Sequence, residues 1–499
     1  MALKWLGGGK PDHPLADEKD ARELLASLSK SDAPQAIEDV RHWIESVMAT
    51  EGFKLERRAE LLLQLDEAVQ AHQRKLTRDY LANPKLSKFQ EAQLRRTLSA
   101  LWADLANAGT ACIEQFGADS GAANRMKAQL PLFCVRVVRA LAAQLKWHYM
   151  HYEPGQSAVW QALGKVYRFA ETRKIHRESV AIYPNVPLKS SAEREFMGAL
   201  MLAASAPTCL RPLDIELAER VVAHCSGSFL ISETYRPKAT YNWIDLASGM
   251  PPKRLTQMPT ASPSLRYFAA GTANAQLDNM IRVLMGGALP SDLNLGGTYD
   301  PARVLGVIQH LRMYWAETPP VRKADRYEVK HQLNVVNGLE RILARLQGGT
   351  MDAPVETWVT ENISAGGMGV VVSNAQSDWL GIGRLIGLSV EGGSGACSVG
   401  MVRRCHRTTP QQASVGIRTF AKGAYAVTLH GREDVDALLL SDSTTLGDEV
   451  LVCLREGAFD KRESQSLAFE GHNYLLIPVD IGESGDDFEI GRYRVMQQS

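Results

Sequence analysis

The sequence predicts an α+β multidomain protein, in which an N-terminal all-α helical array precedes a small β-barrel and a C-terminal β-rich segment. The helical part is indicated by apolar residues that recur at three- and four-residue steps through most of residues 1–317. Thr318-Pro319-Pro320 then marks a boundary, because consecutive prolines disfavour helix and hold the chain extended. Short β-prone runs separated by glycine-rich turns follow, as in a small barrel or sandwich.

Each predicted helix has one apolar face. Ile37, Val40, Ile44 and Val47, for example, fall on one side of a helix. Turn-prone residues separate the helical runs. The predicted helices cover residues 37–47, 56–80, 92–116, 135–152, 158–175, 192–206, 214–225, 273–284 and 301–315. Many antiparallel helices in series indicate a repeat-like or solenoid-like array.

Two segments of this region have patterns of their own. Trp160, Leu163, Gly164 and Tyr167 are similar to the opening of a tetratricopeptide repeat, but no second copy is visible at a period of about 34 residues. We therefore expect a single helix of the array there. Residues 229–255 predict a β-hairpin set into the helical region.

The β-rich part divides into a barrel and an acidic tail. Its predicted strands cover residues 327–336, 357–363, 368–373, 382–390, 397–405 and 413–418, with a helical insert over 339–346 and a last β-rich stretch over 425–495. Residues 431–499 contain 6 basic and 15 acidic residues, a balance that repels nucleic-acid backbones. The predicted domains are a helical region over residues 1–317, a barrel over 318–422 and an acidic β-rich segment over 423–499.

Composition excludes several classes of protein. Of the 499 residues, 45% are hydrophobic and 22% are charged, as in a globular protein with a large core. Lys plus Arg and Asp plus Glu both number 56, which argues against a DNA- or RNA-coating protein or a polybasic membrane binder. No apolar run is long enough for a membrane span. The seven cysteines lack Cys-x-x-Cys spacing, so we expect reduced thiols in a cytoplasmic protein, without disulfides or a metal site.

Two motifs in the β-rich part have the chemistry of a nucleotide site. Arg322 and Arg326 are four residues apart. Each guanidinium can bind phosphate oxygens, or the O6 and N7 edge of guanine, through two parallel hydrogen bonds. On its own, such a pair is usually a solvated surface feature.

The second motif is Asn362-Ile-Ser364-Ala-Gly366-Gly367. The amide of Asn362 and the hydroxyl of Ser364 can hydrogen-bond a base. Gly366 and Gly367 allow a sharp turn and the close approach of a ligand. On its own, this motif is usually just a turn.

In this order, and followed by barrel strands, the two motifs resemble the PilZ domain. That bacterial family is a six-stranded β-barrel that binds the second messenger cyclic di-GMP, and its signature is Arg-x-x-x-Arg before the barrel and Asp/Asn-x-Ser-x-x-Gly within it. Residues 379–388, 399–404 and 415–417 are similar to later strands of the family. The resemblance covers about residues 318–422.

The resemblance implies a role for each motif residue. Arg322 and Arg326 would hold the phosphates and the Hoogsteen edge of the guanines, and Asn362 and Ser364 would bond the guanine of the other half. Gly367 would allow close approach. Cyclic di-GMP would be the ligand, with no cofactor, metal or catalytic residue. Position 362 is Asn where Asp is commoner, and a neutral amide is the weaker acceptor.

The sequence therefore predicts a cytoplasmic effector that is not an enzyme. It would couple cyclic di-GMP binding at the barrel to a rearrangement of the helical region, or to the binding of a protein partner by that region. Two alternatives remain open. One is a protein-interaction scaffold whose PilZ-like domain does not bind nucleotide. The other is an enzyme in the helical half, where no motif suggests a reaction.

Overall fold

The computed structural model describes residues 11–28, 31–83, 86–184, 188–318, 324–348, 355–373, 375, 379–390, 397–409, 411–441 and 446–498. Arg322 of the first motif lies outside these residues. The chain forms two compact units. The first lies within residues 1–320, and the second consists of residues 321–499 together with two short segments, Tyr152–Pro154 and Thr208–Arg211.

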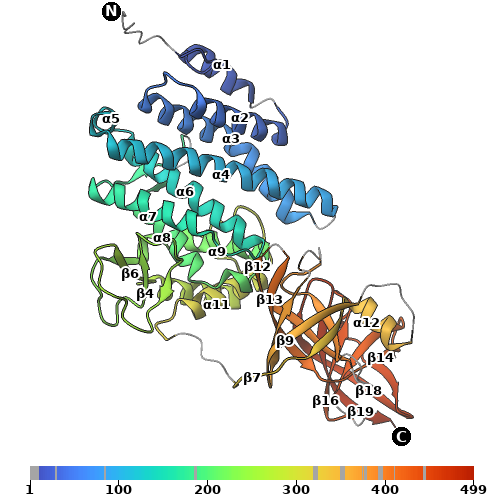
Figure 1. Cartoon of the computed structure of the whole chain (residues 1–499). Coiled ribbons are helices and arrows are strands. Elements are labelled where there is room, and N and C mark those ends of the chain that lie inside the picture. Colours follow the sequence, from blue (N-terminus) through green and yellow to red (C-terminus); the bar gives the residue numbers. More distant parts are fainter. Residues whose placement is uncertain are drawn as a thin grey trace, which may run out of the picture. The chain divides into compact units, whose positions relative to one another are not determined.

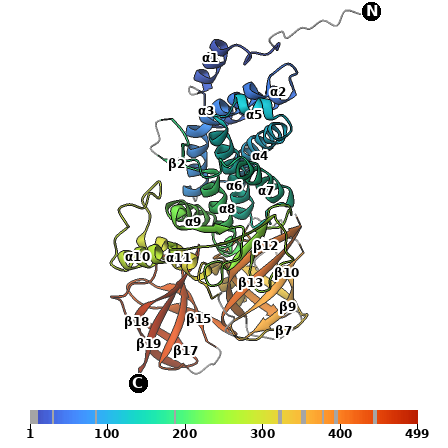
Figure 2. The same ribbon diagram turned by 90° about the vertical axis from the view of Figure 1, so that its left-hand side faces the viewer.

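The first unit is a stack of helices, shown in Figures 1 and 2. They are α1 (Glu18–Leu28), α2 (Ala33–Ala49), α3 (Leu55–Ala82), α4 (Lys88–Ala118), α5 (Ser120–Arg125), α6 (Leu130–Met150), α7 (Ser157–Thr172), α8 (Ala192–Ala203), α9 (Pro212–His224), α10 (Ala273–Met285) and α11 (Pro301–Tyr314). Successive helices pack against each other, α3 on α2 and α4, α6 on α4, α7 and α8, and α9 on α8 and α11. The predicted N-terminal helical region is confirmed. None of the helices in the described residues has both the length and the apolar character needed to cross a membrane.

Local signals fix several helix ends. The side chains of Asp32 and Asp300 accept hydrogen bonds from the first-turn amides of α2 and α11, and each helix has a proline in its first turn. Ser87 and Gln90 form a capping box at the start of α4. Helix α1 was not predicted, because its sequence is mostly polar and only Ala21 and Leu28 are buried.

The predicted hairpin belongs to a larger sheet within the first unit. This antiparallel sheet has the order β3-β6-β4-β5. Its strands are β3 (Leu230–Ser232), β4 (Asn242–Asp245), β5 (Lys253–Arg254) and β6 (Leu265–Ala269). Strands β4 and β5 pair directly, whereas β6, which was not predicted, lies between β3 and β4 and is buried along its whole length. A separate pair consists of β1 (Val180–Ala181) and β2 (Lys189–Ser190).

The second unit begins with a closed six-stranded barrel, which confirms the predicted fold. Its elements are β7 (Tyr327–Glu328), β8 (Gln332–Asn337), α12 (Leu339–Leu346), β9 (Glu356–Ser364), β10 (Gly367–Val372), β11 (Leu385–Val390), β12 (Ser398–Thr409) and β13 (Gln412–Ala421). The order β9-β10-β13-β12-β11-β8 closes by pairing β8 with β9, and the short strand β7 lies along the same edge of β9 as β8. Apolar residues such as Val335, Trp358, Val370, Ile386 and Val415 fill the interior.

The C-terminal strands form a second, nearly closed barrel. They are β14 (Ala424–Leu429), β15 (Val435–Leu440), β16 (Glu449–Leu454), β17 (Gln465–Phe469), β18 (His472–Ser484) and β19 (Glu489–Gln498), in the order β14-β15-β16-β19-β18-β17. A bridge between His430 and Ser466 links its two edges. The predicted β-rich character of the C-terminal region is confirmed.

Helix α12 packs against both barrels. The turn from β8 into α12 passes through Gly338, whose φ of 83° favours glycine. Leu339, Ile342 and Leu343 then point into an apolar cluster that contains strand residues of both barrels, including Leu385 and Leu438. The two barrels therefore share part of their core.

We expect the substitution Ile342→Ala to destabilise both barrels. Ile342 is 1% exposed, and truncating a buried isoleucine costs about 2–5 kcal/mol. Hydrogen exchange should become faster in both β11 and β15. The matched control, Arg345→Ala, changes the exposed side of α12 and should leave both strands protected. Faster exchange confined to the first barrel would show that the second is stable without this contact.

Candidate functional site

Asn362 and Ser364 lie at the end of β9, where the chain turns into β10. Ser364 pairs with Gly367, so Ala365 and Gly366 form the turn between the two strands. The Ser364 hydroxyl donates a hydrogen bond to the carbonyl oxygen of Gly367 at 3.0 Å. The hydroxyl oxygen keeps lone pairs that can accept a hydrogen bond from a ligand.

A β-bulge in β9 turns both side chains away from the barrel interior. The pairing with β10 shifts between Thr360 and Asn362, so Glu361 is an extra residue. Thr360 before the bulge and Ile363 after it both line a cavity inside the barrel. Since side chains alternate along a strand and a bulge shifts that alternation by one, Asn362 and Ser364 lie on the outer face.

Strand β7 brings Arg326 to Asn362. It pairs with the end of β9 through Tyr327 with Ile363 and Glu328 with Asn362. Arg326 precedes this strand, and its Nη1 donates a hydrogen bond to Asn362 Oδ1 at 3.0 Å. Arg326 is exposed and Asn362 is half-buried, so a ligand in solution can reach both. The structure thus brings one residue of each motif into contact.

Two glycines of β10, Gly367 and Gly369, lie beside the side chains of Asn362 and Ser364, and we call them the glycine floor. A Cβ atom at Gly367 would lie 2.0 Å from the carbonyl oxygen of Ile417 on β13, so no larger residue fits there. A Cβ at Gly369 would lie 2.9 Å from Nδ2 of Asn362, which places the Asn362 side chain directly over Gly369. Gly366 is exposed at the turn, with open space where its Cβ would be.

The outer face continues onto residues that the sequence analysis did not identify. Gly367 pairs with Arg418 and Gly369 pairs with Gly416, both on β13. Gly416 in turn pairs with Arg404 of β12. Directly paired residues have side chains on the same side of a sheet, so Arg404 and Arg418 share the face of Asn362 and Ser364. The alternation of Gly367 and Gly369 is the only sequence signal for this floor.

The charges of this face favour an anion. Arg326, Arg404 and Arg418 contribute three guanidinium groups, against two carboxylates, Glu328 and Glu483, the latter bonded to Arg418. Burial and the neighbouring charge of Arg404 lower the pKa of His406 on β12, so His406 adds no positive charge at neutral pH. The positive charge of the face therefore comes from arginines, which do not titrate at physiological pH.

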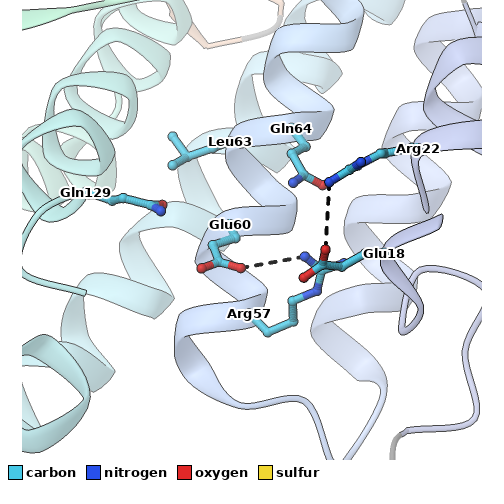
Figure 3. Close-up of a pocket in the computed structure, with 7 residues that line it drawn as sticks. All are labelled: Glu18, Arg22, Arg57, Glu60, Leu63, Gln64 and Gln129. Atoms are coloured by element: carbon cyan, nitrogen blue, oxygen red, sulfur yellow. Dashed lines mark ion pairs between the residues drawn. The ribbon is translucent and has the colours of Figure 1, made fainter. Parts of the chain in front are cut away.

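Two cavities among the described residues lie away from this outer face. One of about 130 Å³ opens inside the barrel among mostly apolar side chains, including Leu333, Met368 and Leu388. Another, of about 280 Å³, lies between helices of the first unit and is shown in Figure 3. Its lining consists of Glu18, Arg22, Arg57, Glu60, Leu63, Gln64 and Gln129. Its arginines pair with its glutamates at 3.8 and 3.6 Å, so it has no excess charge for an ionic ligand.

The described residues contain no cluster of metal-ligating side chains. No group of three or more His, Cys, Asp or Glu side chains gathers there in a way that holds an ion. Burial raises the pKa of the Cys405 thiol to about 11, so this thiol stays protonated and unreactive at neutral pH.

The helical unit is similar to a known family. Residues 19–237 match the family described as the N-terminal domain of the cyclic-di-GMP receptor FimW. The match begins in α1 and ends just beyond β3, so it covers mostly residues of the first unit and does not include the candidate site. No curated protein matches the chain.

We expect Gly369→Ala to displace the Asn362 side chain and to leave the barrel folded. The atoms nearest to the new methyl group would be those at the end of that side chain, which can rotate away and give up its bond to Arg326. The NMR signal of the Asn362 side-chain amide, assigned through Asn362→Ala, should shift. Gly366→Ala adds the same methyl group in open space and should leave the signal in place. An unshifted signal in the Gly369 variant would contradict the described packing.

Proposed function

We propose that this protein is a cyclic di-GMP receptor whose nucleotide site is the outer face of the first barrel. The observation that supports this most directly is the hydrogen bond between Arg326 and Asn362, which joins the two motifs. A second line of support comes from another part of the chain, since residues 19–237 match a family named for a cyclic-di-GMP receptor. The two observations are independent, because the motifs lie beyond the matched residues.

The first barrel supports assignment to the PilZ family. It has six strands and is closed, and the Asn-x-Ser-x-x-Gly motif spans its β9–β10 turn. Arg326 reaches the motif from the segment before the barrel, which is the arrangement that the family signature requires.

The chemistry of the face fits a cyclic dinucleotide. The ligand has two phosphates and two guanines, and arginine binds both kinds of group in bidentate fashion. Arg326 and Arg322 would bind phosphate and the O6 and N7 edge of guanine. Asn362 and Ser364 would hydrogen-bond a guanine lying beside Gly367, which has no side chain of its own to obstruct a flat base.

We further propose that binding is coupled to the helical unit through the segment that contains the arginines. Arg322 and Arg326 lie in the chain between α11 and β8. When both hold a nucleotide against the barrel, this connecting segment is fixed at one more point, and the number of arrangements open to the two units falls. The nucleotide can favour one arrangement only by its difference in affinity for the alternatives. The helical unit would then present a surface to a protein partner.

Calorimetric titration of the full chain with cyclic di-GMP tests the receptor. Arg326→Ala, Arg322→Ala and Ser364→Ala should each weaken binding at least about tenfold, because each removes hydrogen bonds to charged or polar ligand groups. Arg345→Ala, an exposed arginine on α12, is the matched control and should bind as the wild type does. Cyclic di-AMP should bind at least about tenfold more weakly, since adenine has an amino group where guanine has O6.

If the folded wild type releases no heat with cyclic di-GMP, the receptor proposal fails. The barrel would then act as a protein-docking module, and affinity for a protein partner would be insensitive to the nucleotide.

Small-angle X-ray scattering tests the coupling. The radius of gyration or the distance distribution should change when saturating nucleotide is added to the wild type, and should stay constant in Arg326→Ala. Identical profiles for the free and saturated wild type would contradict the coupling and leave the receptor proposal intact.

A further inference from the structure

Arg418 extends the candidate site across the barrel. Ser364 pairs with Gly367, and Gly367 pairs with Arg418, so the three residues form one row across β9, β10 and β13. Neighbouring strands lie about 4.8 Å apart, which puts the Cα atoms of Ser364 and Arg418 roughly 10 Å from each other. The residue between them has no side chain. The row thus has the Ser364 hydroxyl at one end, Gly367 without a side chain in the middle and the Arg418 guanidinium at the other end.

The second barrel supplies a carboxylate to this arginine. Glu483 of β18 accepts a hydrogen bond from Nη1 of Arg418 through one oxygen. Its other oxygen lies 3.3 Å from Nη1 of Arg403 on β12. The two arginine side chains are 51% and 53% exposed, whereas Glu483 is 21% exposed. One carboxylate is therefore shared by two guanidinium groups that remain accessible to solvent.

The position of Glu483 is fixed by its own barrel. It pairs with Ile490 of β19 next to a register shift in β18. Ile490 is 2% exposed and belongs to the apolar cluster that α12 forms between the barrels. Met401, which pairs with Arg418 from β12, is buried in the same cluster. The outer face of the first barrel thus meets the second barrel directly beyond Arg418.

We propose that Arg418 is a further nucleotide-binding residue and that Glu483 competes with a ligand phosphate for it. This inference rests on the proposed function, because it assigns the ligand to the same face. In the free protein the carboxylate neutralises part of the charge of Arg418. A phosphate bound over Gly367 would be attracted by Arg418 and repelled by Glu483. Through Glu483, the second barrel would then influence the affinity of the site for the nucleotide. When the nucleotide binds, the ion pair between Glu483 and Arg418 would weaken, and with it one contact between the two barrels.

Titration of the full chain with cyclic di-GMP tests both residues. Glu483→Gln should tighten binding about two- to fivefold, the effect expected from removing a partly exposed charge, and the effect should shrink at high salt. Arg418→Ala should weaken binding about tenfold. In the double variant, Glu483→Gln should give little or no tightening, because the arginine through which Glu483 acts is absent.

A second ion pair of β18 offers matched controls. Asp480 lies on the same strand and pairs with Arg492 at 2.5 Å. Asp480→Asn changes the net charge by the same amount as Glu483→Gln, and Arg492→Ala matches Arg418→Ala. Both should bind as the wild type does. Circular dichroism establishes that each variant is folded.

The outcomes separate the two proposals. If the wild type binds and Arg326→Ala does not, but the Arg418 and Glu483 variants equal the wild type, this inference is wrong and the receptor proposal stands. Weaker binding by Glu483→Gln, or equal tightening by Asp480→Asn, would also overturn it. If the folded wild type does not bind cyclic di-GMP, both proposals fail.

Discussion

The pairing of β7 with the end of β9 is the contact on which the candidate site depends. Only two residues of β7 pair, but they place Arg326 beside Asn362, a residue 36 positions later in the chain. Without this pairing the arginine would belong to a connecting segment with no defined relation to the barrel. Because Arg326 lies just before β7 and not in the closed barrel, its hydrogen bond to Asn362 is formed by an exposed group that a ligand can recruit.

The bulge at Glu361 and the glycines of β10 give the site its shape. Regular alternation would have turned Asn362 inward with Thr360, whereas the extra residue sends Asn362 and Ser364 outward. Gly367 lies so close to β13 that a side chain there would collide with the backbone. The result is a flat surface bounded by polar and cationic side chains and not an enclosed pocket. Such a surface suits a large, planar, anionic ligand better than a small metabolite.

An acidic residue of the second barrel contacts the basic outer face of the first barrel. Its excess of carboxylates suggests a region that would keep anions away, yet one of them, Glu483, contacts two arginines of the first barrel. The two barrels also share an apolar cluster through α12, and Ile490 of that cluster pairs with Glu483, so the contact lies next to a common core. The second barrel is therefore placed where it can influence the charge of the first.

Much of the fold was determined by the sequence itself, since helices and strands follow from local patterns of apolar and turn-forming residues. The insert Leu339–Leu346 and most strands of the first barrel were predicted to within a few residues, because their periodicity is strong and glycines separate them. The single strand predicted over residues 327–336 is two strands, β7 and β8, in the structure. Helix α1 and strand β6 were missed, since one is mostly polar and the other is a short apolar run between loops. The motif residues were identified from their spacing, and their chemistry depends on residue type alone.

The tertiary structure alone decided which of these residues meet. The bulge, the pairing of β7 and the row from Ser364 to Arg418 all depend on strand register, which is a property of paired strands and not of one strand alone. Glu483 is 65 residues from Arg418 in the chain and comes from a different barrel, so nothing in either neighbourhood marks the two as partners. Local sequence fixes the side chains that are available, and long-range packing fixes their neighbours.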